Sequence, residues 1–151
     1  MARPARVRLL NRQRRLKLDA AALRALAERV LAGEGAAADA AVEIVLVRDG
    51  AIRDLNGAYL SKPVPTDVLA FPTDRTAWPA GETPLLGSVV VSTDRAAAQA
   101  AERGLCPAHE LERLVAHGVL HLLGYCDGTP GARARMHRRE DRYLAPRAGQ
   151  R

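Results

Sequence analysis

Short apolar runs rich in β-branched residues alternate with segments of helical spacing along this chain, and this alternation limits its fold most. The strand-like runs are residues 7–10, 42–47, 67–71 and 85–92. Helical segments are expected at 19–32, from 49 onwards, and at 93–104, 107–123 and 132–144. Sheets bury their apolar faces under helices. We therefore expect an α+β (mixed α/β) fold, with a small central mixed β-sheet covered by helices.

The ends of the expected helices follow from capping residues. Short polar side chains accept hydrogen bonds from the free amide groups of a first helical turn. Asp19 and Asp49 are therefore expected to cap the first two helices, and Thr93 or Asp94 the third. Glycines end the expected helices at positions 33, 35, 104 and 124. The stretches 62–66 and 73–83 contain proline and polar residues and are expected to be loops.

With 151 residues the chain suits one domain, covering 1–151, with flexible basic ends at about 1–5 and 146–151. No apolar run approaches the roughly 18 residues of a membrane span. Residues 1–18 lack the continuous apolar stretch of a secretory signal. Two cysteines, Cys106 and Cys126, do not make a disulfide framework. A cytoplasmic protein is expected.

The charge balance favours anionic partners. The formal net charge is +6, and residues 3–17 hold seven positive charges and no acid. Residues 133–151 are also rich in arginine. Such a balance is typical of nucleic-acid binding, although a general preference for arginine over lysine in this chain would produce it too.

The segment from His117 to Asp127 carries the residues best suited to chemistry. His117 and His121 are four residues apart on an expected helix, where side chains are neighbours at about 5–6 Å. Both rings can reach one zinc ion at about 2.0–2.1 Å. Gly124 permits a left-handed turn, after which Asp127 can supply a carboxylate. Three ligands and an open position are typical of catalytic zinc.

Two alternatives remain open from the residues alone. Paired histidines are often solvated or hydrogen-bonded in the core without any metal. This helix is strongly apolar, however, and buried histidines need partners. Cys126 competes with Asp127 as the third ligand, because thiolates also bind zinc; otherwise it is a small buried residue.

Three ordered motifs resemble the YbeY family of metal-dependent rRNA maturation endoribonucleases. The family's His-Gly-x-x-His-Leu-x-Gly helix, followed by Tyr-Asp-His, is similar to residues 117–127, which places the third family ligand at Asp127 and so favours it over Cys126. Met136 and Glu140 match a later methionine and glutamate. The other two motifs match residues 55–72 and 86–92, so the resemblance covers roughly 42–144.

The chain departs from the family pattern at three positions. Asp127 replaces a histidine, which adds a negative charge and makes the ion a weaker Lewis acid. Ser88 replaces an acid in the strand motif. Leu60 replaces an arginine, and a guanidinium is a natural phosphate clamp. Lys62, two residues on, can substitute for it only as a point charge.

The resemblance implies a single-strand-specific, metal-dependent endoribonuclease with a zincin-like metal-site helix. It implies one Zn²⁺ per chain, or another divalent metal, and no catalytic side chain beyond the metal-bound water. Its family role is maturation of the 16S rRNA 3′ end and ribosome quality control. The implied partners are 16S rRNA, the small ribosomal subunit and a ribosome-assembly GTPase, with no membrane. Lys62 and Asp67 are expected to bind substrate, and Glu140 to orient a histidine ligand.

Two other functions compete with the nuclease. The histidine pair is similar to the zinc-peptidase pattern His-Glu-x-x-His, but Gly118 occupies the place of the glutamate that acts as general base there. A non-catalytic, zinc-stabilised ribosome or RNA-binding protein is the other alternative, and the loss of the arginine at Leu60 supports it.

Overall fold

A computed structural model describes residues 6–37, 40–60, 66–73 and 85–144 of the chain. Lys62, which is expected to bind substrate, and most of the expected loop at 73–83 lie outside these residues, as do both ends. The strands are β1 (Val7–Asn11), β2 (Ala41–Val47), β3 (Val68–Pro72) and β4 (Leu85–Ser92). The helices are α1 (Ala20–Gly33), α2 (Asp49–Leu60), α3 (Thr93–Arg103), α4 (Pro107–Leu122) and α5 (Pro130–Tyr143).

The four strands form one sheet in the order β1-β2-β4-β3. β1 pairs with β2, and β2 with β4, in parallel, whereas β3 runs antiparallel to β4. The sheet is therefore mixed, as expected. The central strands β2 and β4 are almost wholly apolar, which is typical of parallel strands that are covered on both faces.

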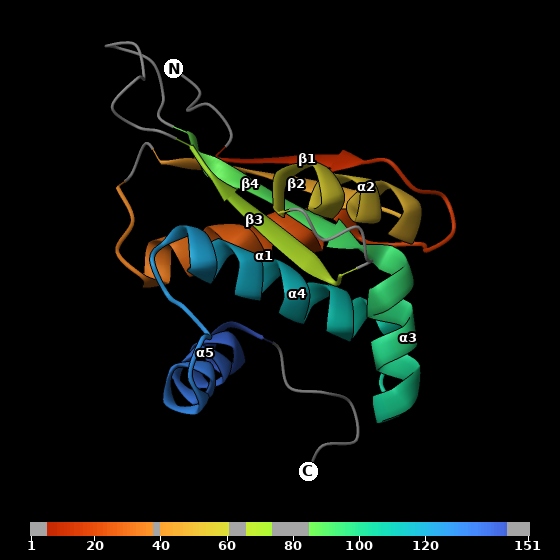
Figure 1. Ribbon diagram of the computed structural model, residues 1–151. Coiled ribbons are helices and arrows are strands. Elements are labelled where there is room, and N and C mark those ends of the chain that lie inside the picture. The colour runs from red at the N-terminus through yellow and green to blue at the C-terminus, as the bar shows by residue number, and fades with distance from the viewer. Residues whose placement is uncertain (1–5, 38–39, 61–65, 74–84, 145–151) are drawn as a thin grey trace.

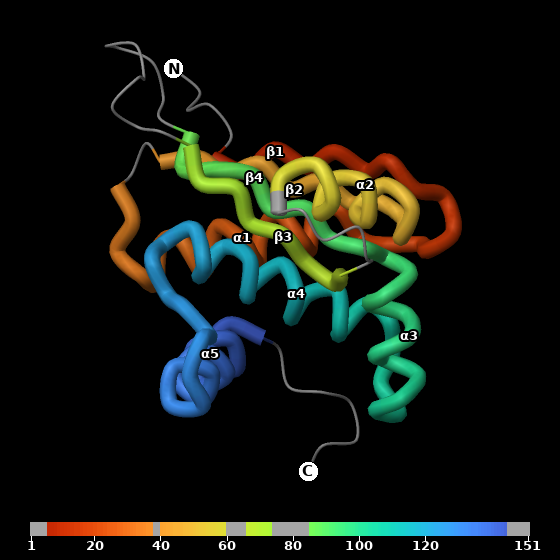
Figure 2. The backbone as a smooth tube through the Cα atoms, viewed as in Figure 1, coloured from red at the N-terminus to blue at the C-terminus, as the bar shows by residue number. Residues whose placement is uncertain are grey.

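Helices cover the two faces of the sheet unequally (Figures 1 and 2). α1 and α4 lie side by side under one face and enclose the larger apolar core, whereas α2 lies over the other face. On that second face Ile52 packs with Val47, Leu69 and Val90. α5 lies below α4, away from the sheet, so α4 is sandwiched between the sheet and α5 (Figure 1).

The structure corrects three expected helix starts. Ser92, rather than Thr93 or Asp94, caps α3 by accepting a hydrogen bond from the Arg95 amide. Asp49 is the first residue of α2 and lies inside its first turn, where its charge favours the helix dipole.

The last helix starts two residues earlier than expected. α5 begins at Pro130, and Thr129 caps it by accepting from the Ala132 amide. Proline at the first helical position after a threonine is a recognisable start signal, which the periodicity of apolar residues does not contain. Among the described residues, no helix is long and apolar enough to cross a membrane.

Candidate metal centre

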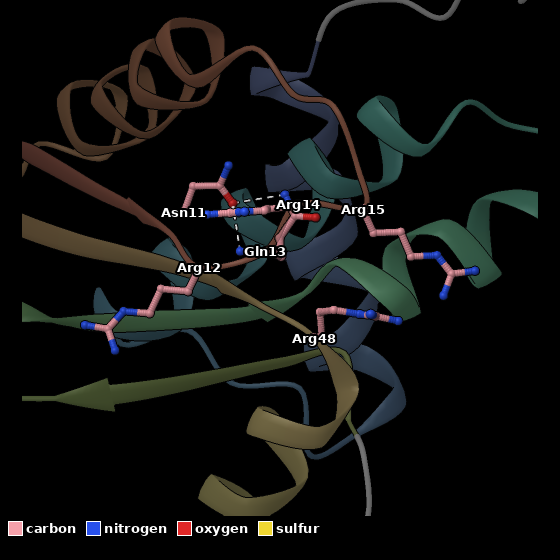
Figure 3. A pocket seen from close by; sticks show the side chains of 6 residues that line it. All are labelled: Asn11, Arg12, Gln13, Arg14, Arg15 and Arg48. Atoms are coloured by element: carbon pink, nitrogen blue, oxygen red, sulfur yellow. Dashed lines mark hydrogen bonds between the residues drawn. The ribbon is translucent and has the colours of Figure 1, made fainter.

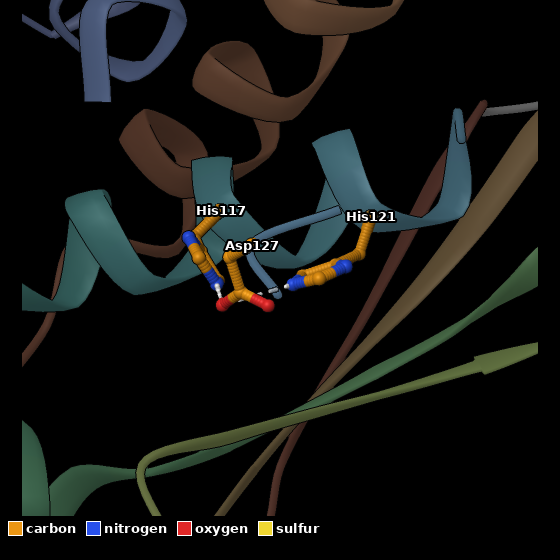
Figure 4. Close-up of side chains that lie close together, drawn as sticks. All are labelled: His117, His121 and Asp127. Atoms are coloured by element: carbon orange, nitrogen blue, oxygen red, sulfur yellow. Dashed lines mark ion pairs between the residues drawn. The ribbon is translucent and has the colours of Figure 1, made fainter. Parts of the chain in front are cut away.

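His117 and His121 project from the same side of α4, and the carboxylate of Asp127 lies between their rings (Figure 4). Their ring centroids lie 4.7 Å apart, and the ring planes are inclined by 76°. Both side chains are partly exposed, 19% for His117 and 29% for His121. The expected i, i+4 convergence is present, and the pair remains accessible from solvent.

Gly118 sets how closely α4 approaches the sheet. A Cβ atom at this position would overlap a methyl group of Val89 on β4. Gly87 on the same strand is just as crowded, because a Cβ there would meet Leu122 and the backbone of Phe71. These contacts turn position 118 towards the sheet and leave His117 and His121 on the neighbouring, open side.

Asp127 reaches the histidines from the loop between α4 and α5. Gly124 has a φ of +105°, a backbone conformation that favours glycine and turns the chain back after the helix. One carboxylate oxygen of Asp127 then lies 3.4 Å from Nε2 of His117 and 3.6 Å from Nε2 of His121. The three potential ligand atoms all lie within 4.8 Å of one another.

This arrangement fits a tetrahedral metal ion. Bonds of about 2.0 Å in a tetrahedron separate neighbouring ligand atoms by about 3.3 Å, close to the two distances just given. Two imidazoles and a carboxylate are ordinary zinc ligands. Cys126 is exposed and is not part of the cluster. The residues present thus fit a divalent metal at His117, His121 and Asp127.

Glu140 on α5 holds the other nitrogen of His117. Its Oε2 lies 2.9 Å from Nδ1, and its side chain is only 1% exposed. A carboxylate accepts, so Nδ1 donates, and Nε2 is the ring nitrogen that faces Asp127. Arg113 donates to the other oxygen of Glu140 at 3.0 Å and balances its buried charge. The contact is the one expected of a residue that orients a histidine ligand.

The same neighbours change the acidity of His117. Burial alone lowers the pKa of this imidazole, but the hydrogen bond and charge of Glu140 outweigh burial. Asp127 and Asp67 add further negative charge, so the pKa of His117 lies above its ordinary value of 6.5. In the metal-free protein a proton therefore competes with the metal for this ligand.

A second buried carboxylate supports the loop that carries Asp127. Glu34, just after α1, accepts a hydrogen bond of 2.6 Å from the hydroxyl of Tyr125 and another from the hydroxyl of Tyr143. Burial alone raises the pKa of Glu34, but these hydrogen bonds and the charges of Arg139 and Arg142 lower it below its ordinary value of 4.5. No spacing in the sequence connects Glu34 with residues 91 and 109 positions away.

Asp67 lies beside the cluster and not in it. Its carboxylate accepts from the Val68 amide at 2.8 Å and from Gln99 at 3.1 Å. It also lines a small hollow together with His117, Arg113 and Glu140. Asp67 thus lies at the edge of this hollow, whereas Lys62 lies outside the described residues.

Several known proteins are similar to this chain over most of its length. The family model described as Endoribonuclease YbeY matches residues 8–147. A curated Endoribonuclease YbeY of Anaeromyxobacter is 44% identical over 134 residues, which cover 89% of this chain and 68% of the relative. That of Geobacter metallireducens is 36% identical and covers 92% and 93%. The solution structure of TM1509 from Thermotoga maritima superposes with a TM-score of 0.64 at 26% identity, covering 91% and 85%.

Proposed function

The chain belongs to the YbeY family of endoribonucleases, which are metal-dependent hydrolases, and we propose that it cuts single-stranded RNA at a zinc site formed by His117, His121 and Asp127. We further propose that it acts in the cytoplasm on the 3′ end of 16S rRNA and in ribosome quality control. The small ribosomal subunit and a ribosome-assembly GTPase are the proposed partners. Residues 1–151 are proposed to form one domain.

One observation carries the proposal. Three potential ligand atoms converge, and Nδ1 of His117 is hydrogen-bonded to Glu140, which leaves Nε2 for the metal. Glu140 accepts a hydrogen bond from Nδ1, so neutral His117 has its lone pair on Nε2, where a metal can bind it. The side chain of Asp127 is the most exposed of the three, at 43%. An RNA phosphate can therefore approach the cluster from the side of the loop.

Each residue has a defined part in the proposed chemistry. A divalent ion, when bound, supplies Lewis acidity and lowers the pKa of water. His117 and His121 would fix its position, and Arg113 orients Glu140 through their hydrogen bond. Asp67 provides an acceptor at the edge of the cleft to which a ribose hydroxyl can donate. Lys62 is proposed as a phosphate contact.

The geometry at Gly118 speaks against a peptidase. A glutamate there would have to displace Val89 and would point into the sheet, away from the histidine rings. The general base of the peptidase pattern therefore has no place at this position.

The test is a metal analysis joined to an RNA cleavage assay. The protein is purified without a metal-binding tag, its metal content is measured, and it is given single-stranded RNA. His117→Ala should lose metal and cleavage, Asp127→Ala should hold metal only weakly and lose cleavage, and Cys126→Ala should keep both. Metal retained in Asp127→Ala but lost in Cys126→Ala would overturn the ligand assignment.

The non-catalytic alternative gives a different result in the same experiment. The sequence feature that favours it is Leu60 in place of the family arginine. Zinc present at one per chain, RNA binding, and no cleavage above that of His117→Ala would identify a zinc-stabilised RNA or ribosome-binding protein. Loss of thermal stability on chelation would then be its main metal effect.

A further inference from the structure

Several arginines line a pocket at the end of the sheet where β1 and β2 finish (Figure 3). The residues that line it are Asn11, Arg12, Gln13, Arg14, Arg15 and Arg48. Arg12 follows β1 directly and Arg48 follows β2 directly. Because these strands are parallel, their carboxyl ends lie at the same end of the sheet, and Arg12 and Arg48 both follow them there. Crevices at such edges are common ligand sites in open sheets.

A buried glutamine fixes the loop that carries three of these arginines. Gln13 is 5% exposed. Its amide nitrogen donates to Asn11 Oδ1 and to the Leu16 carbonyl, each at 2.9 Å, and its oxygen accepts from the Leu16 amide at 2.8 Å. The Arg12 amide donates to the Leu46 carbonyl of β2 at 2.8 Å. The backbone that presents the arginines is thus held in place, which reduces the ordering cost of binding.

The arginines differ in whether their charge is already neutralised. Arg15 and Arg48 both face Asp94, at 3.7 Å and 3.3 Å. Arg12 and Arg14 are exposed, and neither forms an ion pair or side-chain hydrogen bond within the described part of the chain. Two guanidinium groups therefore stand unpaired beside two whose positions Asp94 fixes.

This pocket and the metal centre lie along the same end of the sheet. Along it β2 is followed by β4 and then by β3. The Ser92 amide at the end of β4 donates to the Asp67 carbonyl at 2.9 Å, and Asp67 lines the hollow beside His117. With strands about 4.8 Å apart, β1 and β3 are separated by about 15 Å, a distance that a short run of nucleotides covers.

We propose that this arginine pocket, formed by Arg12, Arg14, Arg15 and Arg48, is a second RNA contact that binds phosphates flanking the scissile bond. The proposal rests on the proposed nuclease function for the identity of the ligand. Guanidinium groups pair with phosphate oxygens in a bidentate manner. None of the described residues that line the pocket is aromatic, so none of them offers a ring on which a base can stack. The contact therefore reads the backbone and is independent of base sequence.

Binding is tested on the full chain in the presence of a chelator, so that cleavage does not interfere. Fluorescence anisotropy with labelled single-stranded oligouridine is measured across a salt series for the wild type and for Arg12→Ala/Arg14→Ala. The variant should bind several-fold more weakly, and its salt slope should fall by about 1.4, the value for two lost phosphate contacts. Arg12→Lys/Arg14→Lys should recover most of the affinity, because it keeps the charges.

The matched control is Arg133→Ala/Arg135→Ala on α5. It removes the same charge from exposed arginines that have no ion pair among the described residues. It should leave affinity nearly unchanged. Equal weakening by the two double variants would show that only total charge matters, and would overturn the pocket. So would competition by polyglutamate as effective as by RNA, which would identify an acidic protein as the ligand.

Cleavage with metal present gives the second readout. For a long oligouridine the Arg12→Ala/Arg14→Ala variant should raise KM and leave kcat unchanged. For an oligomer too short to reach from the metal centre to the pocket, both parameters should match the wild type. A lower kcat, or an equal effect on both lengths, would contradict a flanking contact. If no variant, including the wild type, cleaves RNA, the proposed nuclease fails, while the anisotropy data still decide the pocket.

Discussion

The histidine pair and Asp127 reach the same point from supports of very different kinds. His117 and His121 are fixed by one helix, whose geometry makes residues four apart neighbours wherever the helix lies. Asp127 is held by a loop, and the position of that loop depends on Gly124, on Tyr125 and, through Tyr125, on Glu34 at the end of α1. One support is local in sequence, and the other is assembled by the whole fold.

The difference shows which parts of a metal site tolerate change. A helix keeps two ligands in register even when its surroundings shift, so the pair should retain some affinity by itself. A loop ligand can be lost through a distant substitution that leaves the helix intact.

Removal of a helix ligand should have the largest effect. His117→Ala removes a ligand and also leaves Glu140 buried without its histidine partner. Metal affinity and cleavage should fall by more than the roughly 100-fold seen when only supporting residues are lost. Titration with zinc, followed by calorimetry, measures the first, and RNA cleavage the second. A variant that still binds one metal tightly would contradict the central place of the pair.

Removal of the loop ligand should cost less. Asp127→Ala keeps both histidines, so weak binding should remain, intermediate between the wild type and His117→Ala. Asp127→His should bind metal again, because a third imidazole is an equally good zinc ligand. If Asp127→Ala is as defective as His117→Ala in the zinc titration, loop and helix contribute equally and the contrast is wrong.

Loss of the carboxylate behind His117 should reduce metal affinity by about 10- to 100-fold. Glu140→Gln keeps the size of the side chain but removes the charge that favours the Nδ1 proton. Asp141→Asn is the matched control, because Asp141 also pairs with Arg113 at 2.9 Å, yet its side chain is 65% exposed and it does not touch the histidine. Equal losses of zinc affinity in the two variants would indicate a general effect of Arg113 instead.

The smallest effect is expected at Glu34, far from the ligands in sequence. Glu34→Gln should lower stability by about 1–2 kcal/mol, because two tyrosine hydroxyls lose a charged acceptor. The metal affinity should fall only slightly, through the loop. Glu28→Gln, an exposed position on α1, is the control and should change neither quantity. Urea unfolding of the metal-free protein measures the stability.

The stability that Glu34 contributes should depend on pH. The folded-state pKa of Glu34 is lowered below 4.5. Its contribution to stability is therefore present above pH 4.5 and is lost as the pH falls through the lowered pKa. The stability difference between wild type and Glu34→Gln should shrink below about pH 4.5. A difference that stays constant from neutral to acidic pH would show that Glu34 does not stabilise through its charge.

What the sequence could predict follows the same division between local and assembled structure. The strands and the histidine pair depend on short periodic patterns. The sequence predicts the strand bounds to within about two residues and the convergence of the two histidine rings. The cap at Ser92 was missed because several neighbouring residues can cap equally well. The hydrogen bonds that Glu34 accepts from two tyrosines cannot be predicted from a local sequence pattern, because the tyrosines come from distant parts of the chain.

The contact between Glu140 and His117 has a consequence for how the protein is made. All four strands precede residue 93 in the chain, whereas both histidines, Asp127 and Glu140 follow it. Synthesis proceeds from the N-terminus, so the sheet leaves the ribosome before the residues of the metal centre. The buried carboxylate that selects the histidine tautomer comes last among them. We therefore expect metal capture to be a late event in biosynthesis, because the proposed ligands leave the ribosome only after the residues of the described strands.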